Sequence, residues 1–479
     1  MTTGEGAMAD VTHGYNTSVE YSLTFFREMA PGWIDLCARI GGYAAAQRKA
    51  KAARYLELGC GQGLGLCILA ATNPSVEFVG VDLQPEHIAH GEALAQAAAL
   101  TNVRFVEGDF VELARDWPKD FGQFDYVTLH GVLNWISDAV REAVVGCVAH
   151  AIRGGSRVYT GYSAQPGWIS TVPFQHVTKM LKGQYTSAQQ VRSEAIALFD
   201  QLAAAKAPIF EQLPTLQSRV DAVRQKDDNY FVHEYLNDSW RPLWHSEVAA
   251  QFATAALQFV GSATMGDTLM PEILHPSFRE LIGEQPTRQL REDLQDLVIN
   301  QGFRRDCFVR ADVAPMRGGL ESTPETLLYL VADLPAGHTI TLDTSFGTVT
   351  IDYKDWAATA DMLAGGARTI AELLALPEAP AMGQERLIAL LLHAGVLAPA
   401  AAEPAPSEAA ERLNAIIAER AVSGIPYQHV AAAALGSGIH LGPEEMAQLD
   451  GHFRGSTKGQ DARFNEATLP RYRRLGIVA

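Results

Sequence analysis

The stretch that most constrains this chain is a short apolar segment that ends in an acid and breaks into closely spaced glycines. Tyr55, Leu56 and Leu58 form the apolar segment, and glycines follow at positions 59, 61, 63 and 65. Residues 66–71, Leu-Cys-Ile-Leu-Ala-Ala, have the composition of a helix. A strand, a glycine loop and a helix in this order predict a ligand site, because glycine lets backbone N–H groups approach a ligand closely.

The glycine spacing argues against a dinucleotide. The G-x-G-x-x-G fingerprint counted from Gly59 needs a glycine at position 64, and counted from Gly61 it needs one at position 66. Both positions hold leucine. The motif that is present, Glu-Leu-Gly-Cys-Gly-Gln-Gly over residues 57–63, resembles motif I of class I S-adenosylmethionine (SAM) methyltransferases. A glycine-rich structural turn in another α/β protein is the alternative.

Three later strand ends fall where that family places its cofactor contacts. Residues 76–83 form a β-branched segment with Asp82 at its end, and an acid there can accept hydrogen bonds from both ribose hydroxyls. Residues 103–110 end in Gly-Asp-Phe, where the resemblance implies that Asp109 holds the adenine amine and Phe110 covers the ring. A fourth strand, 124–130, would end facing the transferable methyl group.

Residues 12–53 precede the first strand, and apolar positions from Ile34 to Ala46 have helical spacing. Two amphipathic helices packed on the sheet edge are the simplest interpretation. In class I methyltransferases such helices often cap the cofactor, and Tyr15 and Tyr21 would suit a sulfonium cation. The cofactor-binding set implied by the motifs and the resemblance is Tyr15, Tyr21, Glu57, Gly59, Gly61, Gly63, Asp82, Leu83, Asp109, Phe110 and His130.

Charge and cysteine content limit the partners and the compartment. The chain has 38 basic and 55 acidic residues, a formal charge of −17. This balance disfavours a nucleic-acid partner, since phosphate binding depends on Lys and Arg, and it suits a cationic substrate or solubility alone. No apolar run approaches the roughly 20 residues of a membrane span, and residues 1–10 lack the apolar core of a signal peptide. Five cysteines without a C-x-x-C pair predict a cytoplasmic, reduced protein with no metal site.

Strand-like and helix-like segments alternate over residues 54–162, which predicts a parallel, doubly wound sheet with its ligand at the carboxyl strand ends. The alternation stops over residues 168–243, which have helical character, and it resumes with strands at 257–264 and 303–310. The expected fold is therefore α/β, with a seven-stranded class I methyltransferase (Rossmann-like) sheet and a helical insertion at 168–243. The strands expected before the insertion are 54–58, 76–82, 103–107, 124–130 and 156–162, with helices near 64–72, 86–99 and 134–152.

The rest of the chain is expected to form smaller units. Residues 338–352 alternate with period two around a glycine and predict a hairpin in a small α+β, winged-helix-like domain. A proline-rich linker over 396–406 precedes one clear helix, 408–421, and a basic tail expected to be solvated. The chain thus divides into cap helices (1–53), the SAM-binding core (54–315) with its regulatory or lid insertion, the winged-helix-like domain (323–400) and a helical C-terminal segment (407–479).

Methyl transfer from a sulfonium is an in-line displacement, so the protein supplies alignment and a neutral nucleophile. Residues 129–135, Leu-His-Gly-Val-Leu-Asn-Trp, differ from the Asn/Asp-Pro-Pro-Tyr/Phe signature of enzymes that methylate amide or exocyclic DNA nitrogens. His130 and Asn134 are predicted to hydrogen-bond an incoming amine or accept its proton through water; helix capping or cofactor positioning is the alternative. Glu234, beside aromatic residues, is predicted to receive a lysine ammonium, or else to belong to a buried ion-pair network.

A more specific resemblance rests on several segments together. Leu-Glu-Leu-Gly-Cys-Gly at 56–61, the 129–135 segment, His-Glu-Tyr-Leu-Asn at 233–237 and Gly-Phe-Arg-Arg-Asp-Cys-Phe-Val-Arg at 302–310 resemble bacterial methyltransferases that carry a methyltransferase regulatory domain. The best understood members of that family methylate lysines of outer-membrane proteins, so the resemblance implies a protein substrate here, although the motifs themselves do not specify the substrate. The alternatives are a small-molecule methyltransferase and a SAM-binding regulatory protein without turnover. The oligomeric state stays open.

Overall fold

The structure is a computed structural model of the chain. It describes residues 23–43, 53–185, 187–226, 228–269, 274–312, 314–332, 334, 337–344, 347–377, 382–401, 408–456 and 463–479. Tyr15 and Tyr21 lie outside the described residues, so their predicted cofactor contacts stay predictions.

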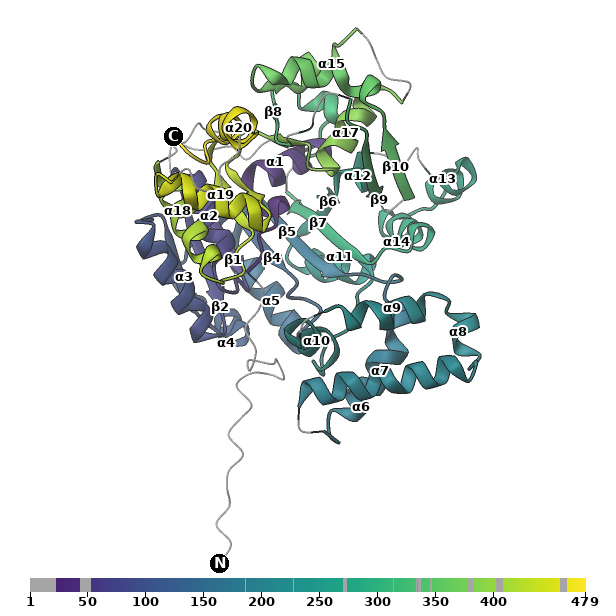
Figure 1. Cartoon of the computed structure of the whole chain (residues 1–479). Coiled ribbons are helices and arrows are strands. Elements are labelled where there is room, and N and C mark those ends of the chain that lie inside the picture. Colours follow the sequence, from purple (N-terminus) through teal and green to yellow (C-terminus); the bar gives the residue numbers. More distant parts are fainter. Residues whose placement is uncertain are drawn as a thin grey trace, which may run out of the picture.

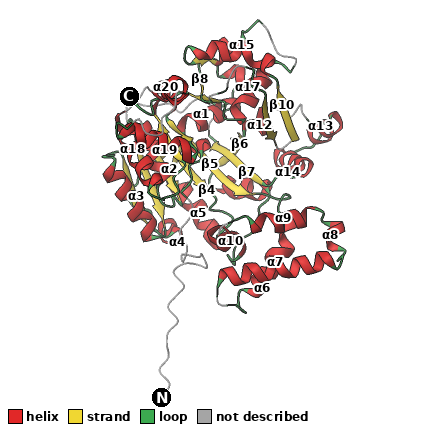
Figure 2. Cartoon of the chain, in the orientation of Figure 1, coloured by secondary structure: helices red, strands yellow, loops and turns green. Residues whose placement is uncertain are grey.

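A seven-stranded sheet forms the centre of the molecule (Figures 1 and 2). Its strand order is β3-β2-β1-β4-β5-β7-β6, with β7 antiparallel to both neighbours and the remaining neighbouring pairs parallel. The predicted seven-stranded class I methyltransferase sheet is confirmed. The strands are β1 (Ala53–Leu58), β2 (Val76–Asp82), β3 (Val103–Glu107), β4 (Phe124–His130), β5 (Ile152–Ser163), β6 (Leu257–Ser262) and β7 (Phe303–Arg310).

Alternating side chains of the strands point to opposite faces of the sheet, and each face has its own core. Tyr55 and Tyr126 point to one face, and Leu56 and Val127 point to the other. The first face packs against α1, α2 and α3, and the second against α5 and α11. The helices flanking the sheet are α1 (Pro31–Ile40), α2 (Leu64–Thr72), α3 (Pro85–Ala97), α4 (Phe110–Arg115), α5 (Asp138–Ala151), α11 (His245–Thr254), α12 (Met265–Leu269), α13 (Pro276–Gly283) and α14 (Arg288–Ile299).

Helix α1 is fixed to the sheet by polar contacts as well as by apolar packing. Asp35 forms a 2.9 Å ion pair with Arg157 of β5 and accepts a hydrogen bond from the Tyr126 hydroxyl of β4. The Trp33 indole N–H donates to the carbonyl of Ala263, just after β6. The helix expected from residue 34 to 46 is therefore present, but it begins at Pro31 and ends at Ile40, ahead of a pair of glycines.

The insertion between β5 and α11 is helical, as predicted, and has a hydrophobic core of its own. Phe174, Phe199, Val220 and Phe231 are among its buried residues. Figure 1 shows these helices beside the sheet and not across it. None of the described helices has both the length and the apolar character that crossing a bilayer requires. The helices of the insertion are α6 (Val172–Leu181), α7 (Ala188–Ala204), α8 (Ile209–Gln212), α9 (Thr215–Arg224) and α10 (Asp228–Tyr235).

An α+β unit follows β7. Its predicted hairpin is present, with β9 (Ile340–Thr344) antiparallel to β10 (Gly347–Ile351). A second sheet has the order β11-β8-β12, so the linker expected to begin at residue 396 instead starts as strand β12 (Leu397–Pro399), paired with β8. The other elements are β8 (Leu327–Leu330), α15 (Tyr353–Ala364), β11 (Arg368–Thr369), α16 (Ile370–Leu374) and α17 (Gln384–His393). Its winged-helix-like character stays a prediction.

The expectation of a solvated C-terminal tail is wrong. Tyr472, Leu475 and Ile477 are fully buried, and the Asn414 side chain donates to the carbonyls of Ala431 and Ile477. The prediction considered only the basic residues of the tail and overlooked the apolar residues between them, which supply the packing. The elements, yellow in Figure 1, are α18 (Glu408–Val422), β13 (His429–Ala432), β14 (Ser437–His440), α19 (Pro443–Phe453) and α20 (Leu469–Leu475), and they lie beside α2.

Candidate functional site

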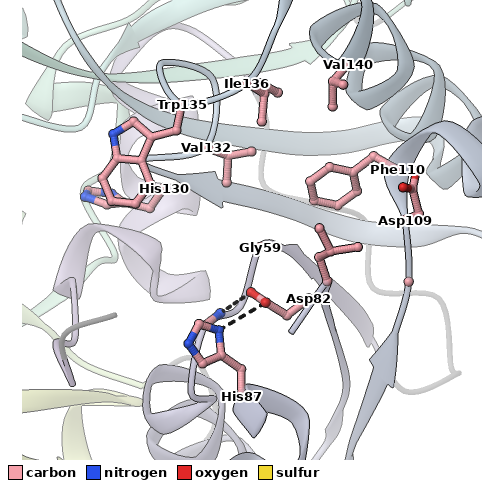
Figure 3. Close-up of a pocket in the computed structure, with 14 residues that line it drawn as sticks. Gly59, Asp82, His87, Asp109, Phe110, His130, Val132, Trp135, Ile136 and Val140 are labelled. Atoms are coloured by element: carbon pink, nitrogen blue, oxygen red, sulfur yellow. Dashed lines mark hydrogen bonds and ion pairs between the residues drawn. The ribbon is translucent and has the colours of Figure 1, made fainter. Parts of the chain in front are cut away.

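A cavity opens at the carboxyl ends of β1, β2, β3 and β4 (Figure 3). This is where a doubly wound sheet places its ligand, because the strand order reverses there between β1 and β4. Seven residues of the predicted cofactor set line it, namely Gly59, Gly61, Asp82, Leu83, Asp109, Phe110 and His130. Trp135, which the sequence position predicts as a wall of the pocket, also lines it, whereas sequence reasoning missed His87, Gly108, Gly131, Val132, Ile136 and Val140.

The glycine loop after β1 follows a path that side chains would block. Gly59 has a φ of +77°, and a Cβ there would lie 2.6 Å from Cγ2 of Val132. Gly63 has a φ of +74°, and a Cβ there would lie 2.5 Å from the Phe105 ring. Positive φ and close approach together explain glycine at both positions. The loop backbone can therefore face the cavity directly, as a cofactor requires.

Asp82 is held in place by three hydrogen bonds. Its Oδ2 accepts from the Gly61 backbone N–H at 2.8 Å, and its Oδ1 accepts from His87 Nδ1 at 3.1 Å (Figure 3). The Gln84 backbone N–H also donates to Oδ1, at 3.0 Å. A carboxylate has about four acceptor positions, so about one remains for a ribose hydroxyl while these bonds persist. No sequence pattern singles out His87, five residues after Asp82 on α3, as a contact of this carboxylate.

Asp109 and Phe110 form the β3 side of the cavity. The Asp109 side chain caps α4, accepting from the backbone N–H of Val111 at 2.6 Å and of Glu112 at 3.3 Å. This cap starts the helix directly after the strand. Phe110, the first residue of α4, therefore places its half-buried ring on the cavity beside Asp109 (Figure 3).

Glu57 lies on a second cavity, on the other side of the glycine loop. This cavity is lined by Glu57, by residues 23–26 and by residues 59–65, and it shares Gly59, Gly61 and His130 with the first. Burial, together with the nearby charge of Asp82, raises the pKa of Glu57 to about 8. At neutral pH the Glu57 carboxyl is therefore mostly protonated.

His130 stands where the two cavities meet. Its ring stacks on Phe26 at a centroid distance of 3.6 Å, and its Nδ1 lies 2.8 Å from the Tyr159 hydroxyl. Burial, and secondarily the charge of Arg305, lowers its pKa well below the usual value. A Cβ at Gly161 would lie 2.4 Å from His130 Nδ1, so the glycine leaves room for the ring. His130 is thus neutral and enclosed by aromatic groups.

Two residues predicted to meet the acceptor lie elsewhere. Asn134 is buried, and its amide donates to the carbonyls of Ser163 and Arg241 and accepts from the Ser163 backbone N–H. It lines neither cavity and ties the loop after β4 to β5 and to the insertion. Glu234 lines neither cavity either. It lies on α10 in the insertion, where burial raises its pKa to about 7 against the opposing effect of the Trp240 indole.

A larger cleft of about 580 Å³ adjoins the second cavity and shares Phe25 and Phe26 with it. Four parts of the chain line this cleft: residues 25–33, Arg305 of β7, the α+β unit after β7, and the C-terminal segment. A ligand in the cleft would therefore reach His130 by passing Phe26.

The charged groups of the cleft form ion pairs with one another and leave a net charge of +1. Glu28 pairs with Arg27 at 3.5 Å and with Arg305 at 3.9 Å, and Glu445 pairs with Arg471 at 3.1 Å. Three guanidinium groups and two carboxylates give the cleft no negative charge of its own. Within the described part of the chain, no group of three His, Cys, Asp or Glu side chains is placed to hold a metal ion.

These features fit SAM. The glycine loop can take a close backbone approach, Asp82 can accept from the ribose, and Asp109 and Phe110 offer a polar and an aromatic contact at the next strand end. Glu57 and His130 lie at the end nearest the cleft. The same residues that the sequence placed on four separate strands thus form one site.

Comparisons with known proteins find family models and relatives that match this chain. A family model described as "Methyltransferase domain" matches residues 49–160, and one described as "Predicted methyltransferase regulatory domain" matches residues 227–310. The uncharacterized protein sll1526 of Synechocystis sp. is 30% identical over 366 residues, which cover 75% of this chain and 71% of that protein. The uncharacterized protein RP789 of Rickettsia prowazekii is 23% identical over 314 residues, covering 65% of this chain and 55% of that one.

Among solved structures, PKMT2 from Rickettsia typhi, in complex with AdoHcy, has a TM-score of 0.67 to this chain. The match covers 93% of this chain and 92% of that chain at 16% sequence identity. At this identity the likeness shows a common fold that includes the units after β7, because almost the whole of both chains is covered.

Proposed function

Because the chain belongs to the class I SAM-dependent methyltransferases that carry a methyltransferase regulatory domain, we propose that it methylates lysine side chains of a protein substrate. The enzyme class and the cofactor follow from the family. The acceptor is the new part of the statement, and the cleft beside Phe26 is the observation that carries it. Its volume of about 580 Å³ and its four walls suit a polypeptide segment better than a small acceptor.

The surroundings of His130 favour the form of lysine that reacts. The cofactor supplies an electrophilic methyl group, and the acceptor nitrogen must be neutral to attack it. Phe26, Tyr159 and Phe303 enclose His130, with the Phe303 ring centroid at 5.2 Å. Burial among such groups lowers the pKa of an amine, because it disfavours the charged form.

His130 and Glu57 add little charge at this point, and Arg305, whose charge acts on His130, is paired with Glu28. His130 is neutral because burial lowers its pKa, and Glu57 is mostly protonated because burial raises its pKa. A neutral imidazole does not repel an arriving ammonium group, and the aromatic rings can contact the cation before it loses its proton. Phe26, on the boundary between the second cavity and the cleft, then orients the side chain toward the methyl end.

The test is incubation of the full chain with methyl-labelled SAM and a whole-cell lysate, followed by separate analysis of protein and small-molecule fractions. We expect label on lysines, seen by mass spectrometry as methyl increments. The rate should rise with pH toward the lysine pKa, roughly 10.4 when unperturbed and lower in an apolar site. Asp82→Ala, which lacks the ribose contact, is the matched control. Label confined to small molecules would refute the proposed acceptor without touching the family assignment.

A further inference from the structure

The C-terminal unit, defined as residues 408–456 and 463–479, packs on the two helices that carry the cofactor site. Asn73, at the end of α2, donates to the carbonyl of Gly436 at 2.9 Å. Arg412 of α18 donates to the carbonyl of Ala98, at the end of α3. A Cβ at Gly438 would lie 2.9 Å from Ile68 Cγ2 of α2, so the two parts are in close contact.

One polar chain crosses this interface and ends on the glycine loop. The Tyr427 hydroxyl lies 2.8 Å from His90 Nε2, and His90 Nδ1 lies 2.6 Å from the carbonyl oxygen of Gln62. Tyr427 is 3% exposed, and His90 is on α3, next to Gly91, whose lack of a side chain lets α3 approach Phe105 closely. The connection therefore runs from the C-terminal unit through α3 into the loop.

The chemistry of the groups fixes the direction of both hydrogen bonds. A carbonyl oxygen only accepts, so His90 Nδ1 carries the hydrogen and donates to Gln62. In a neutral imidazole Nε2 is then the acceptor, so the Tyr427 hydroxyl donates to it. Burial raises the pKa of Tyr427 against the opposing hydrogen bond and charge of Arg420, so the hydroxyl keeps its proton. These two hydrogen bonds form the Tyr427–His90 relay, in which Tyr427 donates to His90 and His90 donates to the glycine loop.

The hydrogen bond from His90 meets the loop between two of its glycines. Gln62 stands between Gly61, with a φ of +52°, and Gly63, with a φ of +74°. Two glycines leave this backbone with many accessible conformations when nothing holds it. The Gln62 carbonyl and the Gly63 N–H belong to one planar peptide group. That N–H donates to the Cys60 carbonyl at 3.1 Å, so the hydrogen bond from His90 holds the same peptide group from its other side.

We propose that His90 and Tyr427 are positioning residues that hold the glycine loop in its SAM-binding conformation, which makes the C-terminal unit a working part of the cofactor site. Neither residue lines either cavity of the site, so both act through Gln62. The proposal rests on the cofactor alone and does not depend on which acceptor is methylated.

The test compares Tyr427→Phe with Tyr472→Phe in the full chain, with SAM binding measured by calorimetry in the absence of acceptor. Both changes delete one buried hydroxyl of the same unit, but Tyr472 contacts Glu445 and not the loop. We expect Y427F to weaken SAM binding about 2- to 10-fold, as loss of one neutral hydrogen bond does. It should also speed amide hydrogen exchange over residues 59–64. Y472F should leave both unchanged.

His90→Ala provides the second measurement. If the relay is real, H90A weakens SAM binding, and adding Y427F to H90A causes no further loss, because the two groups act in series. Additive losses would overturn the relay. So would wild-type SAM affinity in Y427F, or the same loss of SAM affinity in Y427F and Y472F.

Discussion

Glu57→Gln tests the electrostatics of the cofactor site most directly. Glu57 is 8% exposed, and burial with the charge of Asp82 raises its pKa from 4.5 to about 8. At pH 7 about nine in ten molecules therefore carry a protonated Glu57 before SAM binds. Glutamine has nearly the same shape as the protonated acid but cannot ionise, so the variant separates the effect of ionisation from the effect of packing.

The raised pKa has a defined effect on stability. Folding favours the protonated form, so the contribution of Glu57 to stability is complete below pH 4.5 and is lost as the pH rises through 8. A separation of about 3.5 pKa units corresponds to roughly 4–5 kcal/mol over that window. E57Q avoids this loss. Urea unfolding at a series of pH values should show that the free energy of unfolding of E57Q, relative to that of wild type, rises by a few kcal/mol from pH 5 to pH 9.

The same proton should leave when SAM binds. SAM carries a sulfonium and an ammonium against one carboxylate, and a net cation beside Glu57 favours its ionised form. If binding brings the pKa of Glu57 below about 6, roughly 0.8 proton is released per SAM at pH 7. Calorimetry at pH 7 in two buffers with different ionisation heats measures that number. E57Q should release none.

Glu107→Gln is the control, because Glu107 is an exposed glutamate at the neighbouring end of β3 that lines neither cavity. Its proton release should match wild type. Release of the same size in E57Q, or none in wild type, would refute the assignment of a protonated Glu57 to the cofactor site.

Four further outcomes are expected. Asp82→Ala should weaken SAM binding at least about tenfold by calorimetry, since hydrogen bonds to a charged group contribute roughly 1.5–3 kcal/mol; equal affinity would contradict its role. Gly161→Ala should lower kcat much more than SAM affinity, because its Cβ would lie 2.4 Å from His130 Nδ1 and displace the ring; an unchanged kcat would show that His130 is dispensable. Glu234→Gln should raise the melting temperature relative to wild type at pH 8 but not at pH 4. The reason is that the raised pKa of Glu234 makes its contribution to stability fall as the pH rises through about 7. A fall in SAM affinity would place Glu234 in the site instead. Added salt should raise KM for a basic protein acceptor and leave kcat unchanged, since a charge of −17 acts on encounter over about 8–10 Å; an effect on kcat alone would exclude steering.

Local sequence patterns predicted the sheet and about half of the residues that line the cofactor cavity. Most of the strands are apolar segments bounded by turn residues, and the functional groups stand one after another at strand ends, where a parallel sheet must bring them together. Asp82 and Asp109 could be found for that reason alone. Gly59 and Gly63 could be found because positive φ and close approach demand glycine, which leaves a mark in the sequence.

Contacts between distant segments left no such mark. Tyr427 and His90 are 337 residues apart, and Asn73 and Gly436 are 363 apart. No sequence periodicity connects residues that are so far apart. The prediction for the C-terminal tail therefore rested on its basic residues, which suggested that it is solvated. Phe26, which stacks on His130, was missed for the same reason, because a phenylalanine near a helix is first expected in a core.

Asn134 and Glu234 show a different limit. Both stand beside residues typical of the site, and proximity in the sequence suggested proximity to the acceptor. Whether a polar side chain faces a cavity or a backbone carbonyl depends on which groups would otherwise be buried without a partner. The Asn134 amide supplies hydrogen-bond partners to the backbone groups of Ser163 and Arg241. Only the fold brings these groups beside Asn134.

The region matched as a regulatory domain, residues 227–310, is not a separate module. It includes β6 and β7, two strands of the catalytic sheet. On β7, Asp306 is fully buried and accepts hydrogen bonds from Tyr162 of β5, from His245 of α11 and from Arg304. Burial alone would raise the pKa of Asp306, but Arg304 and His245 lower it to about 2, so the network keeps its charge.

This network joins the matched region to the site. Asp306 fixes β7 against β5, and the first residue of β7, Phe303, lies 5.2 Å from the His130 ring. Two residues along, Arg305 lowers the pKa of His130 and lines the cleft. A shift of β7 would therefore move an aromatic neighbour and a charge relative to His130 together. In this fold, the part of the chain matched as regulatory reaches His130 through a strand of the sheet itself.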